Sequence, residues 1–99
     1  MKIVISQPMK GLAEEQIRSN RAAVAAVLKA QGHEILDSIF PGFDESKVKY
    51  APLYYLAKSL ALIAEQADAV YFMDGWQGAR SCSLEHEAYV QYGVRIMNE

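Results

Sequence analysis

The sequence has a single cysteine, no run of basic residues and no long apolar stretch, and each absence excludes a class of protein. One thiol, Cys82, cannot form an internal disulfide, so the chain is not a disulfide-stabilised secreted domain. A formal net charge of -2 without a basic cluster argues against binding to nucleic acid or to anionic membranes. No stretch approaches the roughly 20 apolar residues that a transmembrane helix needs. We therefore expect a cytoplasmic protein whose partner is a small molecule.

The remaining composition is that of one packed globular domain, because 52% of the 99 residues are hydrophobic and 22% are charged. The chain opens directly on the strand-like residues 2–6 (KIVIS) rather than on a basic segment and a long apolar run, so we expect no targeting leader. Two distant histidines and one cysteine do not make a set of metal ligands. We therefore predict neither a bound metal nor a cofactor.

Short apolar runs alternate with amphipathic segments along the chain. Strands are predicted at residues 2–6, 33–37, 69–73 and 94–97. Helices are predicted at residues 12–31, 52–67 and 81–92, with Gly32 and Gly93 as stops. Residues 38–51 contain Pro41 and Gly42 and are expected to form a long surface loop. The order βαβαβαβ predicts one doubly wound, flavodoxin-like, three-layer α/β domain with a short parallel sheet over residues 1–99.

Ligands of such sheets bind beyond the carboxyl ends of the strands, where the winding direction reverses. Residues 7–11 (QPMKG) and 74–80 (DGWQGAR) are therefore expected side by side around a crevice. Trp76 offers a ring for stacking or an anchor on the core, and Arg80 and Ser81 begin a helix whose N-terminus can hold a phosphate, with Ser81 as its cap. The candidate substrate-binding residues are Ser6, Gln7, Pro8, Met9, Gly11, Gly75, Trp76, Gly78, Arg80 and Ser81.

The two longer helices each have an apolar stripe that is expected to face the sheet. In the first helix this stripe is Ala13, Ile17, Val24, Val27 and Leu28. In the second helix it is Leu53, Leu56, Leu60, Ile63, Ala64 and Ala67. A second face of that helix, with Tyr55, Ser59 and Leu62, needs cover from a subunit or a neighbouring loop. We therefore predict a homo-oligomer, which the mass in solution light scattering tests.

A carboxylate occupies an unexpected place in the last helix. By helical spacing the inner stripe of that helix is Ser81, Leu84, Glu85, Ala88, Tyr89 and Tyr92. Glu is almost never fully buried unless it has a partner or a function. The helix dipole is expected to keep Glu85 ionised, which suits a nucleophile, although an acid in a first turn is also ordinary helix chemistry. Asp74, at the end of the third strand, is a second catalytic candidate, for a sugar hydroxyl or proton transfer, or a simple turn residue.

Cys82 and His86 give a rival catalytic interpretation. Their i, i+4 spacing at a helix N-terminus is one that can activate a thiol and pair it with a base. Such a pair also arises easily by chance, and no third residue is evident to orient it. The thiol hypothesis predicts that Cys82→Ser abolishes activity while Glu85→Gln does not.

Two blocks of the sequence resemble the nucleoside 2-deoxyribosyltransferase-like superfamily, in particular its short branch of uncharacterised bacterial and phage proteins. The blocks are residues 1–11 (MKIVISQPMKG) and 67–96 (ADAVYFMDGWQGARSCSLEHEAYVQYGVRI), and the resemblance covers nearly the whole chain. The superfamily pattern is a strand, an Asp, a Gly-containing loop and a helix whose early Glu is the nucleophile. By that pattern Glu85 takes the place of the nucleophile and Asp74 that of the strand-end Asp. Ser6 and Gln7 stand where relatives commonly have Ala and Gly.

The resemblance implies cleavage or transfer at the N-glycosidic bond of a (deoxy)nucleoside or nucleoside 5′-monophosphate. The Glu85 carboxylate would attack C1′, the base would depart, and another base or water would resolve the glycosyl-enzyme. The implied enzyme is a nucleoside 2-deoxyribosyltransferase or an N-glycosidase of nucleotide metabolism. The alternative is a non-catalytic nucleotide-binding or sensing module that uses the same crevice. Such a module is expected to tolerate Glu85→Gln with little loss of ligand affinity.

Overall fold

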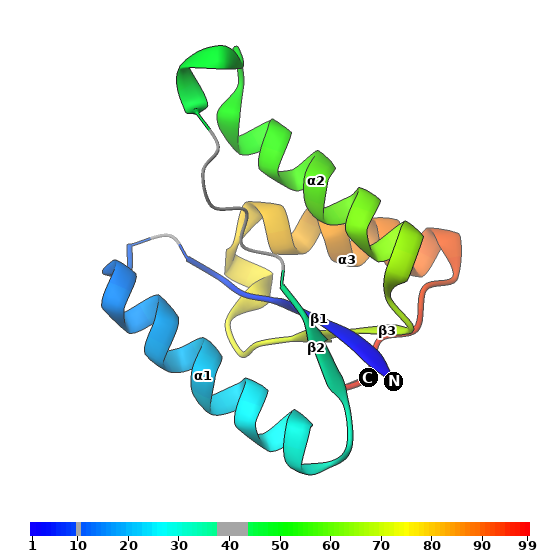
Figure 1. Cartoon of the computed structure of the whole chain (residues 1–99). Coiled ribbons are helices and arrows are strands. Elements are labelled where there is room, and N and C mark those ends of the chain that lie inside the picture. Colours follow the sequence, from blue (N-terminus) through cyan, green and yellow to red (C-terminus); the bar gives the residue numbers. More distant parts are fainter. Residues whose placement is uncertain (10, 38–43) are drawn as a thin grey trace.

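A three-stranded parallel sheet lies at the centre of the protein (Figure 1). The computed structural model describes residues 1–9, 11–37 and 44–99. The strands are β1 (Lys2–Ser6), β2 (Glu34–Leu36) and β3 (Ala69–Phe72), in the order β2-β1-β3. β1 pairs in parallel with both neighbours, with β2 through residues 2–4 and with β3 through residues 3–6. The predicted α/β class and parallel sheet are confirmed.

The fourth predicted strand, at residues 94–97, is reduced to a single parallel bridge between Ile96 and Val70. Beyond this bridge the side chain of Asn98, instead of a strand backbone, forms hydrogen bonds with the backbone of β3. Its Nδ2 donates to the Phe72 carbonyl at 2.7 Å, and its Oδ1 accepts from the Phe72 N–H at 3.2 Å. The prediction of a short strand at residues 94–97 therefore needs correction, because a side-chain amide satisfies backbone groups that a fourth strand would otherwise satisfy.

Within the described residues, three α-helices cover the sheet: α1 (Glu14–Ala30), α2 (Ala51–Gln66) and α3 (Arg80–Tyr92). α1 lies on one face of the sheet, and α2 and α3 lie on the other, which gives three layers (Figure 1). None of the helices in the described ranges is long and apolar enough to cross a membrane.

Two short 3-10 turns precede the last two helices, η1 (Glu45–Lys47) before α2 and η2 (Trp76–Gly78) before α3. The side chain of Asp44 caps η1 by accepting from the Ser46 N–H at 3.0 Å. Part of the loop predicted at residues 38–51, including Pro41 and Gly42, lies outside the described residues.

Alternation along β1 divides the core between the two faces of the sheet. Ile3 and Ile5 pack with Leu28 of α1 on one face. Val4 packs on the other face with Ile63 of α2 and with residues of α3. Each face of this one strand therefore supports a different helix layer.

The predicted inner stripes of the helices are partly wrong. In α3 the buried residues are Cys82, Glu85 and Tyr89, so the helix is rotated relative to the predicted stripe. In α2 the core contact includes Leu62, which the sequence placed on a second face. Spacing gives the period of a helix but not its rotation when apolar residues occur around much of its circumference. The residues predicted to face the core but found exposed are Ala13, Val27, Leu53, Ala64, Ser81, Leu84 and Tyr92.

Asn98→Ala is expected to lower the free energy of unfolding by about 1–2 kcal/mol, because it removes both hydrogen bonds to Phe72. Asn98→Asp keeps an acceptor for the Phe72 N–H but places an oxygen against the Phe72 carbonyl, so it is expected to destabilise as well. Urea unfolding measures both variants. Asn20→Ala on α1 is the matched control. Equal stability of Asn98→Ala and the wild type would contradict the pairing.

Candidate functional site

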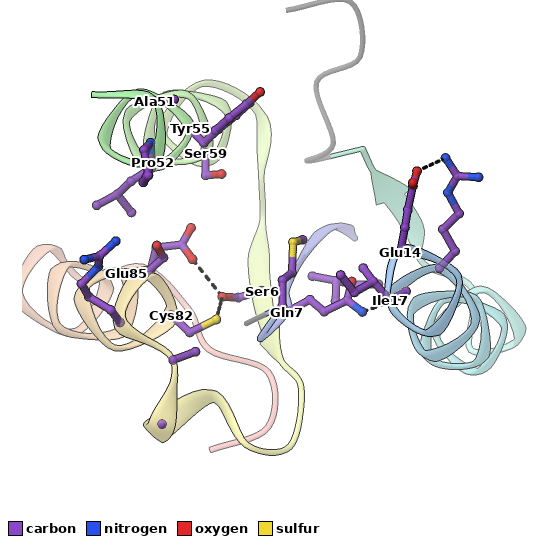
Figure 2. A pocket seen from close by; sticks show the side chains of 18 of the residues that line it. Ser6, Gln7, Glu14, Ile17, Ala51, Pro52, Tyr55, Ser59, Cys82 and Glu85 are labelled. Carbon is purple, nitrogen blue, oxygen red and sulfur yellow. Dashed lines mark hydrogen bonds and ion pairs between the residues drawn. The ribbon is translucent and has the colours of Figure 1, made fainter. Parts of the chain in front are cut away.

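A cavity of about 850 Å³ opens beyond the carboxyl end of β1 (Figure 2). Its lining comes from the end of β1, the first turns of α1, the N-terminal half of α2 and the start of α3. This is the end of the sheet at which the sequence predicts a crevice. A second hollow of about 410 Å³ adjoins it, and the two share residues of α2 and α3.

The two loops predicted to flank the crevice are neighbours in the structure. The Met73 N–H donates to the carbonyl of Ser6 at 3.0 Å, which joins the ends of β1 and β3. A Cβ built on Gly75 would lie 3.8 Å from Cγ of Pro8, an ordinary van der Waals contact, so this glycine lies next to the first loop. Gly75 also has a φ of 88°, in the left-handed region that glycine adopts with little strain. The predicted juxtaposition of the two loops is confirmed.

Glu85 lies on the inner face of α3 and is only 7% exposed. The Ser6 hydroxyl donates to its Oε2 at 2.9 Å, and the Tyr89 hydroxyl, one turn further along α3, donates to its Oε1 at 2.9 Å. Figure 2 shows the carboxylate between Ser6 and the side of α2 that bears Pro52 and Ser59. The buried acid is therefore held through both oxygens at the wall of the cavity.

Burial raises the pKa of the Glu85 carboxyl, and the hydrogen bonds from Ser6 and Tyr89 partly oppose this by lowering it. Desolvation therefore opposes the stabilisation of the ionised form that the helix N-terminus is expected to give, and it has a larger effect on the pKa than the two hydrogen bonds. Burial also raises the pKa of Tyr89, with a further contribution from the Glu85 charge, so the phenol keeps its proton and acts as a donor. Two neutral donors thus orient the carboxylate without neutralising it.

The thiol of Cys82 is buried beside this carboxylate, with Sγ 3.2 Å from the Ser6 hydroxyl. Burial raises the pKa of the thiol, and the nearby carboxylate raises it further, although the Ser6 contact lowers it. His86, the proposed base, makes other contacts. Its ring stacks on Trp76 with centroids 4.2 Å apart, and its Nε2 lies 2.6 Å from Oε1 of Glu99. The geometry therefore does not favour a thiol nucleophile activated by His86.

Seven of the predicted catalytic and binding residues line the cavity: Ser6, Gln7, Met9, Gly78, Arg80, Ser81 and Glu85. Five others are not among its lining residues: Pro8, Gly11, Asp74, Gly75 and Trp76. Asp74 follows β3 as an exposed turn residue. Trp76 packs on Phe72 with ring centroids 5.2 Å apart and stacks on His86, so it anchors the loop on the core. Ser81 is not the cap, because α3 begins at Arg80 with Ala79 as its N-cap.

The walls that α1 and α2 contribute were missed by the sequence analysis. The missed lining residues include Glu14, Ile17, Arg18, Glu45, Pro52 and Leu56. The available signal was the mixed face of α2 with Tyr55 and Ser59. From the sequence, Tyr55 could line the site, but cover by a subunit or a loop was the favoured interpretation of this face. Both residues line the cavity, and the Tyr55 hydroxyl donates to Oε1 of Glu45 at 3.2 Å. A polar and aromatic face on an otherwise apolar helix was therefore a sign of the site.

A metal centre has no support from the side chains that the structure describes. Within the ranges 1–9, 11–37 and 44–99, no three His, Cys, Asp or Glu side chains gather closely enough to hold an ion. The carboxylates in the cavity lining have other partners: Glu14 pairs with Arg18, and Glu45 accepts from Tyr55.

The fold and the site together define a small α/β protein with a buried carboxylate at an open cavity beyond a parallel sheet. The chain belongs to the DUF4406 family, whose description is "Domain of unknown function (DUF4406)" and whose match covers residues 1–98. Comparisons with curated proteins and with solved structures found no match. The resemblance to the nucleoside 2-deoxyribosyltransferase-like superfamily stays a prediction.

Glu85→Gln is expected to stabilise the fold at pH 7–8 by about 0.5–2 kcal/mol, because the amide removes a buried charge. Burial raises the folded-state pKa of Glu85 above its ordinary value of 4.5, so the folded protein binds this proton more tightly than the unfolded chain does. The stability that the protonated group contributes is present below the unfolded pKa and is lost as the pH rises through the folded pKa. The advantage of the amide is therefore expected to shrink in acid.

Urea unfolding of the wild type and Glu85→Gln between pH 4 and pH 8 measures this effect. Glu87→Gln, on the exposed side of the same helix, is the matched control. A difference between Glu85→Gln and the wild type that does not change with pH would argue against a raised pKa.

Proposed function

We propose that this protein cleaves or transfers the N-glycosidic bond of a nucleoside or nucleoside 5′-monophosphate, with Glu85 as the nucleophile. One observation carries the proposal: a carboxylate only 7% exposed lines a large cavity with both oxygens held by hydroxyls. Among the residues that the structure describes, no cation forms a salt bridge with Glu85. Burying a carboxylate without a cationic partner costs free energy, which favours a functional reason for its place.

The proposed mechanism has two displacements at C1′. The Glu85 carboxylate attacks C1′, the C1′–N bond breaks with its electron pair passing to the base, the base takes up a proton, and a glycosyl ester forms. Water or a second base then attacks C1′ and releases the carboxylate. Ser6 and Tyr89 orient the nucleophile. Asp74 has no part in this mechanism, because it is exposed and lies outside the lining, so solvent in the open cavity supplies the proton.

The proposal extends to the sheet, which we interpret as a shortened flavodoxin-like sheet. The order β2-β1-β3 and the parallel bridge at Ile96 support a place for residues 94–97 beside β3. In that order the winding reverses between β1 and β3, next to Ser6. The Asn98 substitutions test the contribution of this edge. A homo-oligomer and a cytoplasmic location stay predictions from the sequence.

Glu85→Gln is expected to abolish base release or exchange while the protein still binds its ligand, because an amide cannot form the glycosyl ester. The experiment incubates the wild type and the variant with nucleosides, deoxynucleosides and their 5′-monophosphates, with and without a free acceptor base. Chromatography follows the released or exchanged base. Glu87→Gln is the control, and it is expected to keep wild-type activity.

Three other outcomes would contradict the proposed function. A wild type that binds a nucleotide in a thermal-shift screen but turns over nothing in the panel would support the sensing module. Loss of activity in Cys82→Ser with retention in Glu85→Gln would instead support the thiol hypothesis. Inactivity without binding would reject the nucleotide proposal altogether.

Tyr89→Phe is expected to reduce kcat/KM by about 10- to 100-fold, because a hydrogen bond to a charged group contributes about 1.5–3 kcal/mol. The Tyr89 hydrogen bond lowers the pKa of Glu85, so its removal raises that pKa. The acid limb of the pH profile of kcat/KM is therefore expected to move to higher pH. A lower rate with an unmoved acid limb would indicate a merely structural role for Tyr89.

A further inference from the structure

The part of the cavity lining that the structure describes offers no ready proton donor for a departing base. It contains no histidine and no lysine. Its carboxylate Glu14 pairs with Arg18, and arginine does not lose its proton in proteins. Its carboxylate Glu45 accepts a hydrogen bond from the Tyr55 hydroxyl at 3.2 Å. Both carboxylates therefore act as acceptors in the structure rather than as acids.

The thiol and the phenol of the lining also hold their protons. Burial raises the pKa of the Cys82 thiol. Desolvation raises the pKa of Tyr55, and its hydrogen bond to Glu45 raises it further. Serine is not among the side chains that ordinarily serve as general acids. Outside the described ranges, residues 38–43 (SIFPGF) have no ionisable side chain, so Lys10 is the one ionisable residue there.

The buried carboxylate of Glu85 lacks a counter-charge among the described residues. Its oxygens are held by the neutral hydroxyls of Ser6 and Tyr89, and none of the salt bridges includes it. Beyond the ion pair of α1, the charged residues of the described lining are Glu45, Glu85 and Arg80. A cationic ligand would therefore offset the free energy that burial of the carboxylate costs.

We propose that the substrate is a nucleoside or nucleotide whose base is a cation, such as a pyridinium or an N-alkylated purine. The inference rests on the proposed function, because it takes the Glu85 carboxylate to attack C1′. It explains two features of the site together. A cationic base needs no proton donor in order to leave, and its positive charge pairs with the buried carboxylate before the reaction.

The chemical step balances without a general acid. The Glu85 carboxylate forms a C–O bond to C1′, and the electron pair of the C1′–N bond passes to the cationic base, which departs as a neutral molecule. The negative carboxylate becomes a neutral ester in the same step. Water then attacks C1′, which releases the sugar, the carboxylate and one proton to solvent. A neutral base would instead leave as an anion unless it took up a proton.

The first test measures binding apart from turnover. Its probe is carbocyclic nicotinamide riboside, a pyridinium in which a methylene replaces O4′, so that C1′ resists cleavage. Benzamide riboside is the neutral control of nearly the same shape. Titration calorimetry is expected to show about 10- to 100-fold tighter binding of the cation, because opposite charges attract strongly at a partly buried site. Glu85→Gln is expected to bring this ratio close to one, whereas the exposed Glu87→Gln leaves it unchanged.

The preference for the cation is expected to depend on pH through Glu85. Burial raises the pKa of this carboxyl, and only its ionised form attracts a cation. The preference is therefore present above the folded-state pKa and is lost as the pH falls through it. The other titratable or charged groups at the cavity are Glu14, Arg18, Glu45, Tyr55, Arg80 and Cys82. Any pH dependence that persists in Glu85→Gln belongs to these groups and would count against the proposal.

The second test compares turnover of matched substrates by the wild type. The pair is 7-methylguanosine and guanosine at pH 6, with their 5′-monophosphates, and nicotinamide riboside represents the pyridinium class. We expect kcat/KM to be about 100- to 10,000-fold higher for the cationic member, because a general acid contributes about that factor and a neutral base lacks one here. Activity on nicotinamide riboside alone would assign the site to pyridinium bases, and activity on 7-methylguanosine alone would assign it to purines.

Two results would overturn the proposal. One is equal binding of the carbocyclic cation and its neutral control, or binding of neither. The other is comparable kcat/KM for guanosine and 7-methylguanosine, since it would show that the protein supplies a proton. Lys10→Met would then test whether Lys10 is the donor, because it would lower the activity on guanosine alone.

The two tests also separate this inference from the proposed function. If the wild type turns over neutral and cationic nucleosides equally through Glu85, the proposed function stands and the preference for cations falls. If the carbocyclic cation binds with a preference that depends on Glu85 but no base is ever released, the cation site stands and the enzyme proposal falls. If no nucleoside of either kind binds or reacts, both fall.

Discussion

The alternation of side chains along β1 is the constraint on which both the core and the site depend. β1 is the central strand, so Ile3 and Ile5 pack toward α1 while Val4 packs toward α2 and α3. The same alternation continues past the core, since Ser6 reaches Glu85 on α3 and Gln7 reaches the opposite layer at α1. A one-residue change of register would reverse all of these contacts, because it exchanges the two faces. Burial of the apolar residues thereby fixes the directions of the polar ones.

The role of nucleophile that we propose for Glu85 places two opposing requirements on its environment. A nucleophile must be oriented and freed of water, but desolvation raises the pKa of the carboxyl and so reduces the ionised fraction. A cation would restore ionisation, but it would also reduce the basicity of the oxygens. The hydroxyls of Ser6 and Tyr89 hold the carboxylate while leaving its charge available. Under the proposed function, this arrangement is expected to cost stability in the free protein, because the needs of function conflict with those of stability.

Much of the framework follows from the sequence, whereas the rotation of the helices does not. β-branched runs predict the strands, and Gly93 ends α3 in the left-handed conformation as expected. Glu85 was identified because a carboxylate interrupts an apolar stripe. Leu84 and Tyr92 were placed on the same stripe, yet the side that Cys82 shares with Glu85 is buried. Which side of α3 faces inward depends on packing against α2 and β3, and spacing along a single helix holds no information about these partners.

Ser6 and Gln7 also show what a family pattern cannot supply. The pattern that this chain resembles commonly has Ala and Gly at these positions, and neither has a polar side chain to offer. In this protein a hydroxyl and an amide replace them at consecutive positions, and the pleat of β1 sends them to opposite layers. One holds the buried carboxylate, and the other keeps an acceptor unpaired at the same cavity. The two departures from the pattern therefore act in different layers, because the hydroxyl contacts the buried carboxylate on α3 and the amide contacts α1.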